Sequence, residues 1–181
     1  MNRVVLLALL LPCLAGCGYR NLNLSTAGRA PRIFFPVLEN LTREPAVEAV
    51  ITGAISREML RSGLAPAGAG AADYRLAGRV SAFETVSRYA ARDYRVGSMP
   101  MRMSATVELD LVTMSTAGPG GAAPPERKIL NAERFYCRSG PFMEPEPEVL
   151  ERLAAELGRK AAEWLAAVVL DGRPDARHGE P

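Results

Sequence analysis

Residues 101–111 read MRMSATVELDL, an almost perfect alternation of apolar and polar side chains. Because successive side chains of a β-strand point to opposite faces of a sheet, this pattern predicts a long strand with one buried and one solvent-facing side. An apolar sheet face must be covered by a second layer of secondary structure. The remainder of the chain is therefore expected to supply further strands and the elements that pack on that face.

A first amphipathic helix is predicted from near Pro45 to Ser62. Thr42 is its candidate N-cap, and Gly63 supplies a C-terminal stop. Apolar residues recur at helical spacing and form a stripe of Val47, Val50, Ile51, Ala54, Ile55, Met59 and Leu60. One side of this helix is therefore suited to cover a sheet.

A second amphipathic helix is predicted towards the C-terminus. Glu146 and Glu148 suit its first turn, where acidic side chains complement the helix dipole, and it should end near Asp171-Gly172. Its apolar stripe consists of Leu150, Leu153, Leu157, Ala161, Trp164, Leu165 and Val168. Both helices are thus apolar on one side only.

Three further strands are predicted. One is residues 32–38, in which Arg32 is followed by a continuous apolar run, and Pro36 near the end indicates an edge or a strand exit. Residues 129–137 form the last strand, with an ambiguous burial pattern. A strand from residue 74 towards Tyr89 places on one face Tyr74, Leu76, Gly78, Val80 and Ala82.

The expected connections are rich in turn-forming or polar residues. Residues 65–72 and 115–125 are Ala/Gly/Pro loops, residues 139–147 are rich in Pro and Glu, and residues 88–102 are expected to be a hairpin connection. The order strand, helix, strand, strand, strand, helix predicts an α+β fold. We expect a two-layer sandwich, with two helices packed on one face of a four-stranded mixed sheet. Its polar outer face would carry Arg75, Arg79, Arg102, Thr106 and Glu108.

The N-terminus predicts a secretory signal peptide over residues 1–16. Arg3 precedes an unbroken apolar run from Val4 to Leu11, which is too short to span a membrane. Leu14-Ala15-Gly16-Cys17 resembles the lipobox of bacterial lipoproteins, although an ordinary signal peptide ending near a Cys is an alternative. The resemblance implies cleavage before Cys17, which would carry a lipid and anchor the chain to a membrane. By the same resemblance, Gly18 in place of Asp favours the outer membrane.

The mature chain is expected to be a single domain. Residues 17–31 would form the lipidated N-terminus and a tether, residues 32–171 a single α+β domain, and residues 172–181 a disordered tail. The chain has 22 basic and 20 acidic side chains, and this balance argues against a nonspecific nucleic-acid binder.

The residues that most often carry catalysis are scarce. His178 is the only histidine, and Cys137 is a single thiol once Cys13 leaves with the signal and Cys17 is acylated. A Cys-His dyad, a Ser-His-Asp triad or a histidine-based zinc site therefore has little to use. We expect no enzyme, no metal and no cofactor. A carboxylate-based hydrolase that uses Glu108 and Asp110, two residues apart on one strand face, remains open.

Several stretches are together similar to the LptE family, the lipoprotein component of the outer-membrane lipopolysaccharide translocon. They are Cys17-Gly18-Tyr19-Arg20, IFFPVLENLTREP at 33–45, ISREMLRSG at 55–63, ADYRLAGRV at 72–80 and YRV at 94–96. They follow the family's order over residues 17 to 170, and the loop 115–125 is a departure. The resemblance implies two helices on a four-stranded sheet. It also implies a plug inside the LptD β-barrel that assists barrel assembly and lipopolysaccharide delivery by binding, at the periplasmic face of the outer membrane.

The candidate lipopolysaccharide-binding residues are a cluster of arginines interleaved with tyrosines. Arg can contact the phosphates of lipid A by charge-assisted, bidentate hydrogen bonds. The cluster consists of Arg88, Arg92, Arg95 and Arg102 with Tyr89 and Tyr94. A solvated hairpin without a ligand is the alternative interpretation of these residues.

A second group of lipoproteins shares some of these features. Curli-secretion channel subunits and activators of peptidoglycan synthases also show a strand ending in Pro, an Asn-Thr turn, an amphipathic helix and an Ala-Asp-Tyr strand. The Cys-Gly-Tyr start, the long alternating strand and a terminal helix containing Trp164 favour the LptE family.

Overall fold

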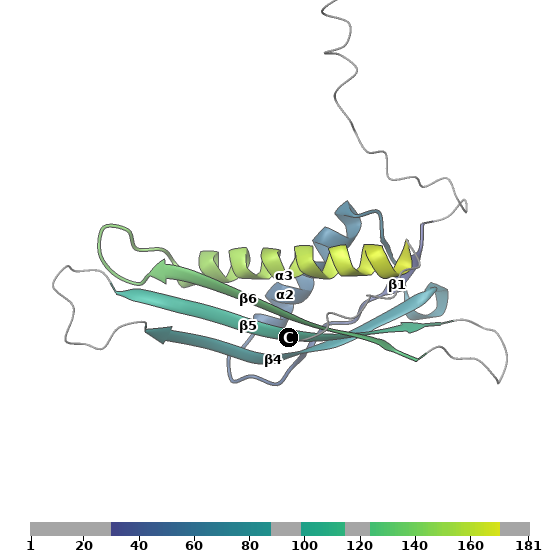
Figure 1. Ribbon diagram of the computed structural model, residues 1–181, viewed down its shortest axis with the longest axis horizontal. Coiled ribbons are helices and arrows are strands. Elements are labelled where there is room, and N and C mark those ends of the chain that lie inside the picture. The colour runs from purple at the N-terminus through teal and green to yellow at the C-terminus, as the bar shows by residue number, and fades with distance from the viewer. Residues whose placement is uncertain (1–29, 88–98, 115–123, 171–181) are drawn as a thin grey trace, which may run out of the picture.

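The computed structural model describes residues 30–87, 99–114 and 124–170. The alternating stretch forms β5 (Pro100–Thr113), which pairs antiparallel with β4 (Tyr74–Ser87) on one side and β6 (Glu126–Cys137) on the other. Every second side chain of β5 from Met101 to Leu111 is buried, as the alternation predicts. These three long strands make up most of the sheet (Figure 1).

The described residues form a sheet of six strands, where four were predicted. The predicted strand 32–38 holds only β1 (Arg32–Phe34), and a second short strand, β2 (Glu39–Asn40), follows it. Pro36 lies between the two and lacks the N–H that a continuous strand requires. The predicted loop 65–72 contains a two-residue strand, β3 (Ala65–Pro66), and a 3₁₀ turn, Ala69–Ala71. The strand order is β3-β1-β4-β5-β6, with β2 also paired to β4. The sheet is mixed, since β1 and β2 run parallel to β4.

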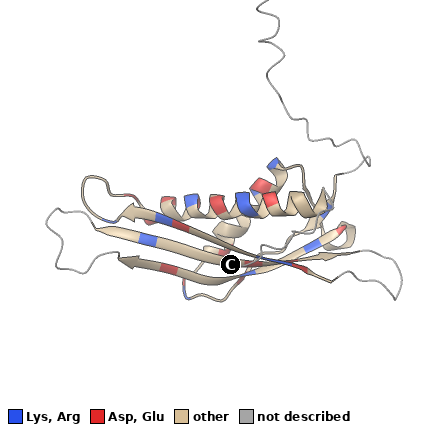
Figure 2. Cartoon of the chain, viewed as in Figure 1, with Lys and Arg blue, Asp and Glu red and all other residues tan. Residues whose placement is uncertain are grey.

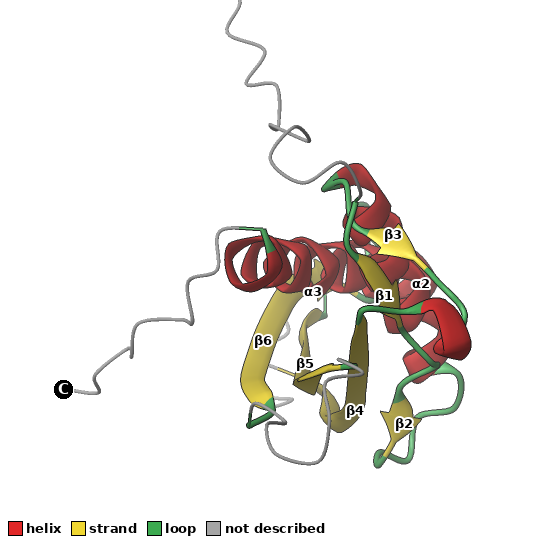
Figure 3. Cartoon of the chain, turned by 90° about the vertical axis from the view of Figure 1, so that its right-hand side faces the viewer, coloured by secondary structure: helices red, strands yellow, loops and turns green. Residues whose placement is uncertain are grey.

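Two helices cover one face of this sheet. They are α2 (Val47–Arg61) and α3 (Glu146–Val169), labelled as in Figure 1, and Figure 3 shows both on the same side of the strands. The core between the layers includes Ile51, Ile55, Leu153, Leu157 and Leu165 from the helices, together with Val80, Val107, Leu109 and Leu130 from the sheet. The predicted α+β sandwich is therefore confirmed as a class.

The start of α2 differs from the prediction. The N-cap is Ala46, which has φ 64° and makes no side-chain capping bond, so Thr42 does not cap the helix. Asn40 instead engages Thr42 in the preceding turn, where Asn40 Oδ1 accepts from the Thr42 N–H at 2.9 Å and from its hydroxyl at 2.7 Å. The predicted stop is confirmed. Gly63 has φ 78°, and the N–H of Leu64 donates to the Met59 carbonyl at 3.0 Å, closing the last turn.

A β-bulge in β4 reverses the inward side of that strand. The register with β5 shifts between Val80 and Ala82, because one extra residue is inserted there. Beyond the bulge Phe83 packs against the core, whereas Ala82 is exposed, so the predicted inward position of Ala82 is wrong. The earlier part of the strand follows the prediction, with Leu76 and Val80 fully buried.

The last strand begins at Glu126, three residues before its predicted start. Its even-numbered residues Leu130, Ala132 and Tyr136 are buried, which resolves the ambiguous pattern of this strand. Ile129 and Phe135 point to the opposite side and are each more than half exposed. Apolar surface therefore lies at both ends of the exposed side of β6.

Candidate functional site

The sheet face opposite the helices carries the candidate site. We call it the polar sheet face and define it by the outward side chains of β4, β5 and β6. Within the described ranges no helix or strand covers this face, and Figure 3 shows both helices on the other side. It includes all five predicted outer-face residues, Arg75, Arg79, Arg102, Thr106 and Glu108, together with Glu84, Ser104, Asp110, Arg127, Asn131 and Glu133.

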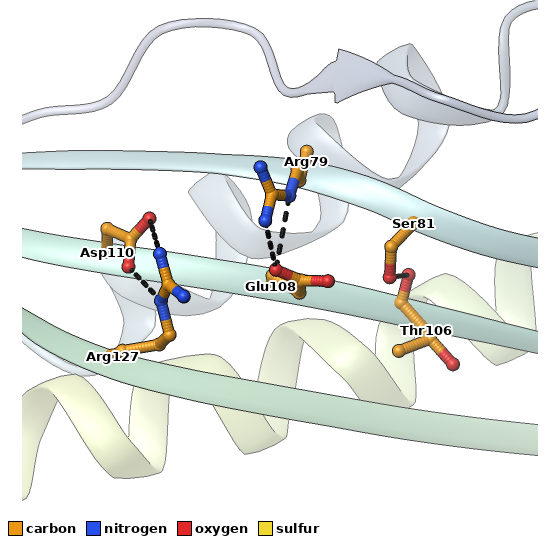
Figure 4. Close-up of polar contacts among 6 residues, drawn as sticks. All are labelled: Arg79, Ser81, Thr106, Glu108, Asp110 and Arg127. Carbon is orange, nitrogen blue, oxygen red and sulfur yellow. Dashed lines mark hydrogen bonds and ion pairs between the residues drawn. The ribbon is translucent and has the colours of Figure 1, made fainter.

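Two cross-strand ion pairs lie side by side on the polar sheet face (Figure 4). Arg79 on β4 donates to Glu108 Oε2 from Nε at 3.1 Å and from Nη2 at 2.7 Å. Arg127 on β6 donates to Asp110 from Nε to Oδ1 at 2.7 Å and from Nη2 to Oδ2 at 3.4 Å. Both carboxylates belong to β5, so the central strand supplies the acids and the flanking strands supply the bases.

These contacts favour the charged forms of Glu108 and Arg127. The hydrogen bond from Arg79 lowers the pKa of Glu108, and the hydrogen bond to Asp110 raises the pKa of Arg127. Glu108 is therefore ionised at neutral pH and cannot serve as a proton donor there. The sequence placed Glu108 and Asp110 next to each other, and the structure shows each one paired with an arginine of its own. Each carboxylate is thus charge-compensated by an arginine on a neighbouring strand.

The middle of the polar sheet face is uncharged. Ser81, at the bulge, donates to the Thr106 carbonyl at 3.4 Å (Figure 4). The Thr106 hydroxyl donates to Asn131 Oδ1 at 2.8 Å. Ala82 lies opposite Thr106 on β4. Small polar side chains thus separate the two ion pairs from the other end of the face, where Glu133 lies 3.9 Å from Arg102.

The predicted arginine–tyrosine cluster is only partly covered by the structure. Arg102 lies within β5 and not in a hairpin connection, because the strand begins at Pro100. Its half-exposed side chain is on the polar sheet face, in register with Val86 and Phe135. Arg88, Tyr89, Arg92, Tyr94 and Arg95 lie outside the described residues, as do Cys17 and the loop 115–123. The described part of β4 ends at Ser87, which pairs with Met101 of β5 next to Arg102.

A second polar region, which the sequence did not reveal, lies on the helix side. A cleft of about 600 Å³ opens between α2, α3 and β6. Figure 2 shows acidic and basic positions alternating along α3 there. The cleft is lined by Glu58, Arg61, Arg134, Phe135, Glu144, Arg152, Ala155, Glu156 and Arg159. Arg61, Arg152, Glu156 and Arg159 fall outside the apolar stripes of the two helices, but nothing in their spacing shows that three elements bring these charges together.

Glu156 is the best-shielded acid of this cleft. Its carboxylate lies 2.8 Å from Lys160 Nζ and 2.6 Å from Arg134 Nη2, and its side chain is 15% exposed. The hydrogen bond from Lys160, with the positive charge of Arg134, lowers the pKa of Glu156. Arg152 pairs with Glu144, and Arg61 pairs with Glu58. The cleft is therefore a network of compensated charges and not a concentration of one sign.

The described residues offer no evident metal centre. No group of three or more His, Cys, Asp or Glu side chains is close enough to hold an ion within residues 30–87, 99–114 and 124–170. Cys137 lies half-buried at the end of β6. In the same ranges, no helix combines the length and the apolar character needed to cross a bilayer.

Comparison with solved structures places this architecture among known ones. The chain superimposes on the hypothetical protein CT253 from Chlamydia trachomatis with a TM-score of 0.52 and 14% identity, covering 77% of this chain and 99% of that chain. The shared property is the fold. A putative lipoprotein from Caulobacter crescentus CB15 has a TM-score of 0.47 at 17% identity, covering 76% of this chain and 93% of that one. The minor lipoprotein from Acinetobacter baumannii has a TM-score of 0.44 at 13% identity, covering 82% and 98%.

These similarities carry no information on function. At such low identity the chlamydial structure shows a common fold alone, and the two lipoproteins are too distant to support an argument. No protein-family model matches the chain, and no match is found among curated proteins. The function must therefore be inferred from the chain's own residues.

Proposed function

We propose that the chain is a lipoprotein of the bacterial outer membrane, anchored through Cys17 at the periplasmic face. There it would act as an LptE-type plug of an LptD-like β-barrel and assist delivery of lipopolysaccharide to the outer leaflet. It would work by binding alone, without covalent chemistry or a cofactor. The lipobox-like sequence and the LptE-like stretches in their order motivate this proposal.

The observation that supports it best is the polar sheet face. This face spans three long strands, and four of its charges are already paired within the chain by the Arg79–Glu108 and Asp110–Arg127 contacts. Paired charges cost less to move out of bulk water than single ones, because each remains compensated by its neighbour. Such a face suits a polar, water-lined surrounding such as a barrel lumen.

Lipopolysaccharide would bind at the Arg102 end of the same face. Arg102 is half-exposed, and Glu133 lies at the long distance of 3.9 Å, so the guanidinium keeps donors for a phosphate. Val86 and Phe135 flank Arg102 in the sheet register and present apolar surface beside it. An acidic headgroup with acyl chains has both of these properties. Arg88, Arg92 and Arg95 would add further cationic contacts.

Affinity purification tests the barrel partner. Tagged mature protein is captured from detergent-solubilised outer membranes, and co-purifying proteins are identified by mass spectrometry. A stoichiometric β-barrel partner with bound lipopolysaccharide is the expected result. Recovery of the chain alone, in a homo-oligomeric ring, or with a peptidoglycan synthase would contradict the proposal and favour the second group of lipoproteins.

The lipopolysaccharide contact is tested with a quadruple variant in which Arg88, Arg92, Arg95 and Arg102 become Ala. Its binding to purified lipopolysaccharide should weaken while its circular dichroism spectrum remains that of the folded domain. A matched control variant replaces four arginines on the helix side by Ala. They are Arg57, Arg61, Arg152 and Arg159, so the control loses the same net charge at a different surface. Equal binding by the quadruple variant and the unaltered protein would remove this part of the proposal.

A further inference from the structure

Strand β6 forms one rim of the sheet. It is the last strand in the order β3-β1-β4-β5-β6, and Figure 3 shows no strand beyond it. In an antiparallel pair, alternate residues direct both their N–H and C=O groups away from the neighbouring strand. The carbonyls of Asn131 and Cys137 accept bonds from outside the sheet, namely from Lys160 Nζ at 2.7 Å and from the Glu144 N–H at 2.9 Å. The odd-numbered residues of β6 therefore present their backbone groups at the rim.

The two contacts also show which backbone positions of β6 are blocked for an additional strand. Met143 and Glu144 bridge the end of β6 at Cys137, which blocks that position for any additional strand. Lys160 reaches Asn131 from α3 by a flexible side chain that is more than a third exposed. The Asn131 carbonyl, in the middle of residues 126–134, is therefore held by a side chain that can move away.

The sequence of this rim segment is self-complementary. It reads ERKILNAER from Glu126 to Arg134. If a second copy is laid antiparallel about Leu130, Glu126 faces Arg134 of the second copy and Arg127 faces Glu133 of the second copy. Every opposed charge pair then has opposite sign, and Leu130 faces itself. In this register the odd-numbered residues face one another, as the backbone pattern at the rim requires.

We propose that the β6 rim is a self-association surface whose occupant is a second copy of this chain. Two β6 strands pair antiparallel over residues 126–134 and join the two sheets into one continuous sheet. This extends beyond the proposed barrel partner, and its test needs only the chain itself. Strand addition at an exposed rim is a common mode of protein recognition, because the backbone supplies hydrogen bonds and the side chains supply specificity.

The charges already present extend this complementarity. Arg127 is paired with Asp110, and Glu133 lies near Arg102, so the new Arg127–Glu133 contact joins two pairs into an alternating row of four charges. On the helix side Arg134 is paired with Glu156, so a Glu126–Arg134 contact extends that network in the same way. Opposite charges directly across antiparallel strands are stabilising, and like charges are destabilising. The antiparallel register about Leu130 is thereby favoured over shifted ones.

Lys160 opposes the addition of a second strand at this rim. Its Nζ occupies the Asn131 carbonyl that would otherwise accept the Ile129 N–H of the second copy. A Lys160→Met variant keeps the aliphatic stem and frees that carbonyl, so dimerisation should strengthen. Lys at an edge is a recognised protection against strand addition.

The decisive experiment uses charge reversal in the mature protein in detergent micelles, with association followed by sedimentation equilibrium. Arg127→Glu alone opposes two carboxylates, and Glu133→Arg alone opposes two guanidiniums, so each should weaken dimerisation about tenfold or more. A mixture of the two single variants restores opposite charges in both contacts. It should form heterodimers, detected by capture of an untagged variant on a tagged one. The double variant should dimerise as the unaltered protein does.

Matched controls place the same charge changes away from the rim. Arg75→Glu and Glu84→Arg lie on β4 of the polar sheet face and should leave dimerisation unchanged. Circular dichroism confirms folding of each variant. A chain that stays monomeric at all accessible concentrations, even with Lys160→Met, overturns the proposal. So does a mixture of the two single variants that forms no heterodimer.

Discussion

Gly158 of α3 lies directly against the backbone of Ala54 of α2. A Cβ atom built on Gly158 would be 2.8 Å from the Ala54 carbonyl oxygen, which is closer than real Cβ atoms approach. Ala161 of α3, one turn further along, is fully buried and also small. The two helices can approach this closely only because the side chains between them are small.

Replacing Gly158 by Ala should lower the free energy of unfolding. Overpacking against backbone costs about 1–3 kcal/mol, which exceeds the gain of about 1 kcal/mol from replacing a helical Gly by Ala. The matched control is Gly53→Ala in α2, where the added Cβ would have only an ordinary contact with Arg57 at 3.5 Å. Urea unfolding should show a loss for Gly158→Ala and a gain for Gly53→Ala. Equal gains would show that the helices can separate at no cost.

Thr52 should contribute to stability through its hydroxyl. Its Oγ1 accepts the buried N–H of Leu38 at 3.1 Å and donates to the Glu48 carbonyl at 2.6 Å. Thr52→Val keeps the shape but leaves the Leu38 N–H without this partner, at an expected cost of about 1–3 kcal/mol. Thr52→Ser retains the hydroxyl and should lose clearly less. If thermal unfolding shows Thr52→Ser to be less stable than Thr52→Val, then packing of the methyl group contributes more than the hydrogen bond.

Glu156 should stabilise the fold in a pH-dependent manner. Because its pKa is lowered in the folded state by Lys160 and Arg134, its contribution is present above the unfolded pKa of about 4.5 and is lost as the pH falls through the folded value. Glu156→Gln should therefore cost about 1–2 kcal/mol at pH 7 and less at pH 3. Glu163→Gln, at an exposed pair with Arg159, should change stability by less than about 1 kcal/mol. A loss for Glu156→Gln that is independent of pH would contradict this account.

The stabilising contribution of Tyr136 should be lost at alkaline pH. Burial and its hydrogen bond to Glu146 at 3.0 Å raise the pKa of Tyr136 to about 12, whereas an unfolded tyrosine titrates near 10. The contribution of the neutral phenol is thus fully present below about pH 10 and is lost between about 10 and 12. Urea unfolding at pH 9 and pH 11 should show a smaller alkaline loss for Tyr136→Phe than for the unaltered chain. Parallel losses would mean that other groups cause the alkaline change.

The elements whose hydrophobic pattern repeats over many residues could be predicted from the sequence. Eleven alternating residues in β5 and the apolar stripe of α3 each repeat their signal several times, so local exceptions do not obscure it. The stop of α2 at Gly63 was also readable, because a positive φ at that position favours glycine. These elements were sufficient to predict two layers with helices on one face.

Structural features that depend on only one or two residues could not be predicted from the sequence. The bulge at Ser81 is a single inserted residue, and it reverses the inward side for Phe83 although the local pattern does not change. The parallel strands β1, β2 and β3 are two or three residues long, too short for any period. Among site residues, Arg79 and Glu108 were correctly placed on the outer face, but their pairing depends on strand register. The helix-side cleft brings α2 together with β6 and α3, which are distant from α2 in sequence.

The place of β1 has a mechanical consequence. This three-residue strand is held by two parallel pairs to β3 on one side and two to β4 on the other, and Arg32 is tied to Asp73 by a backbone–carboxylate bond of 2.8 Å. Tension applied to the chain from the N-terminal side reaches β1 before any other described element. The meander of β4, β5 and β6 lies behind it, with much longer ladders. Under a pulling force β1 would detach first. The meander and the helices that cover it would then unfold in a second step, at a larger force.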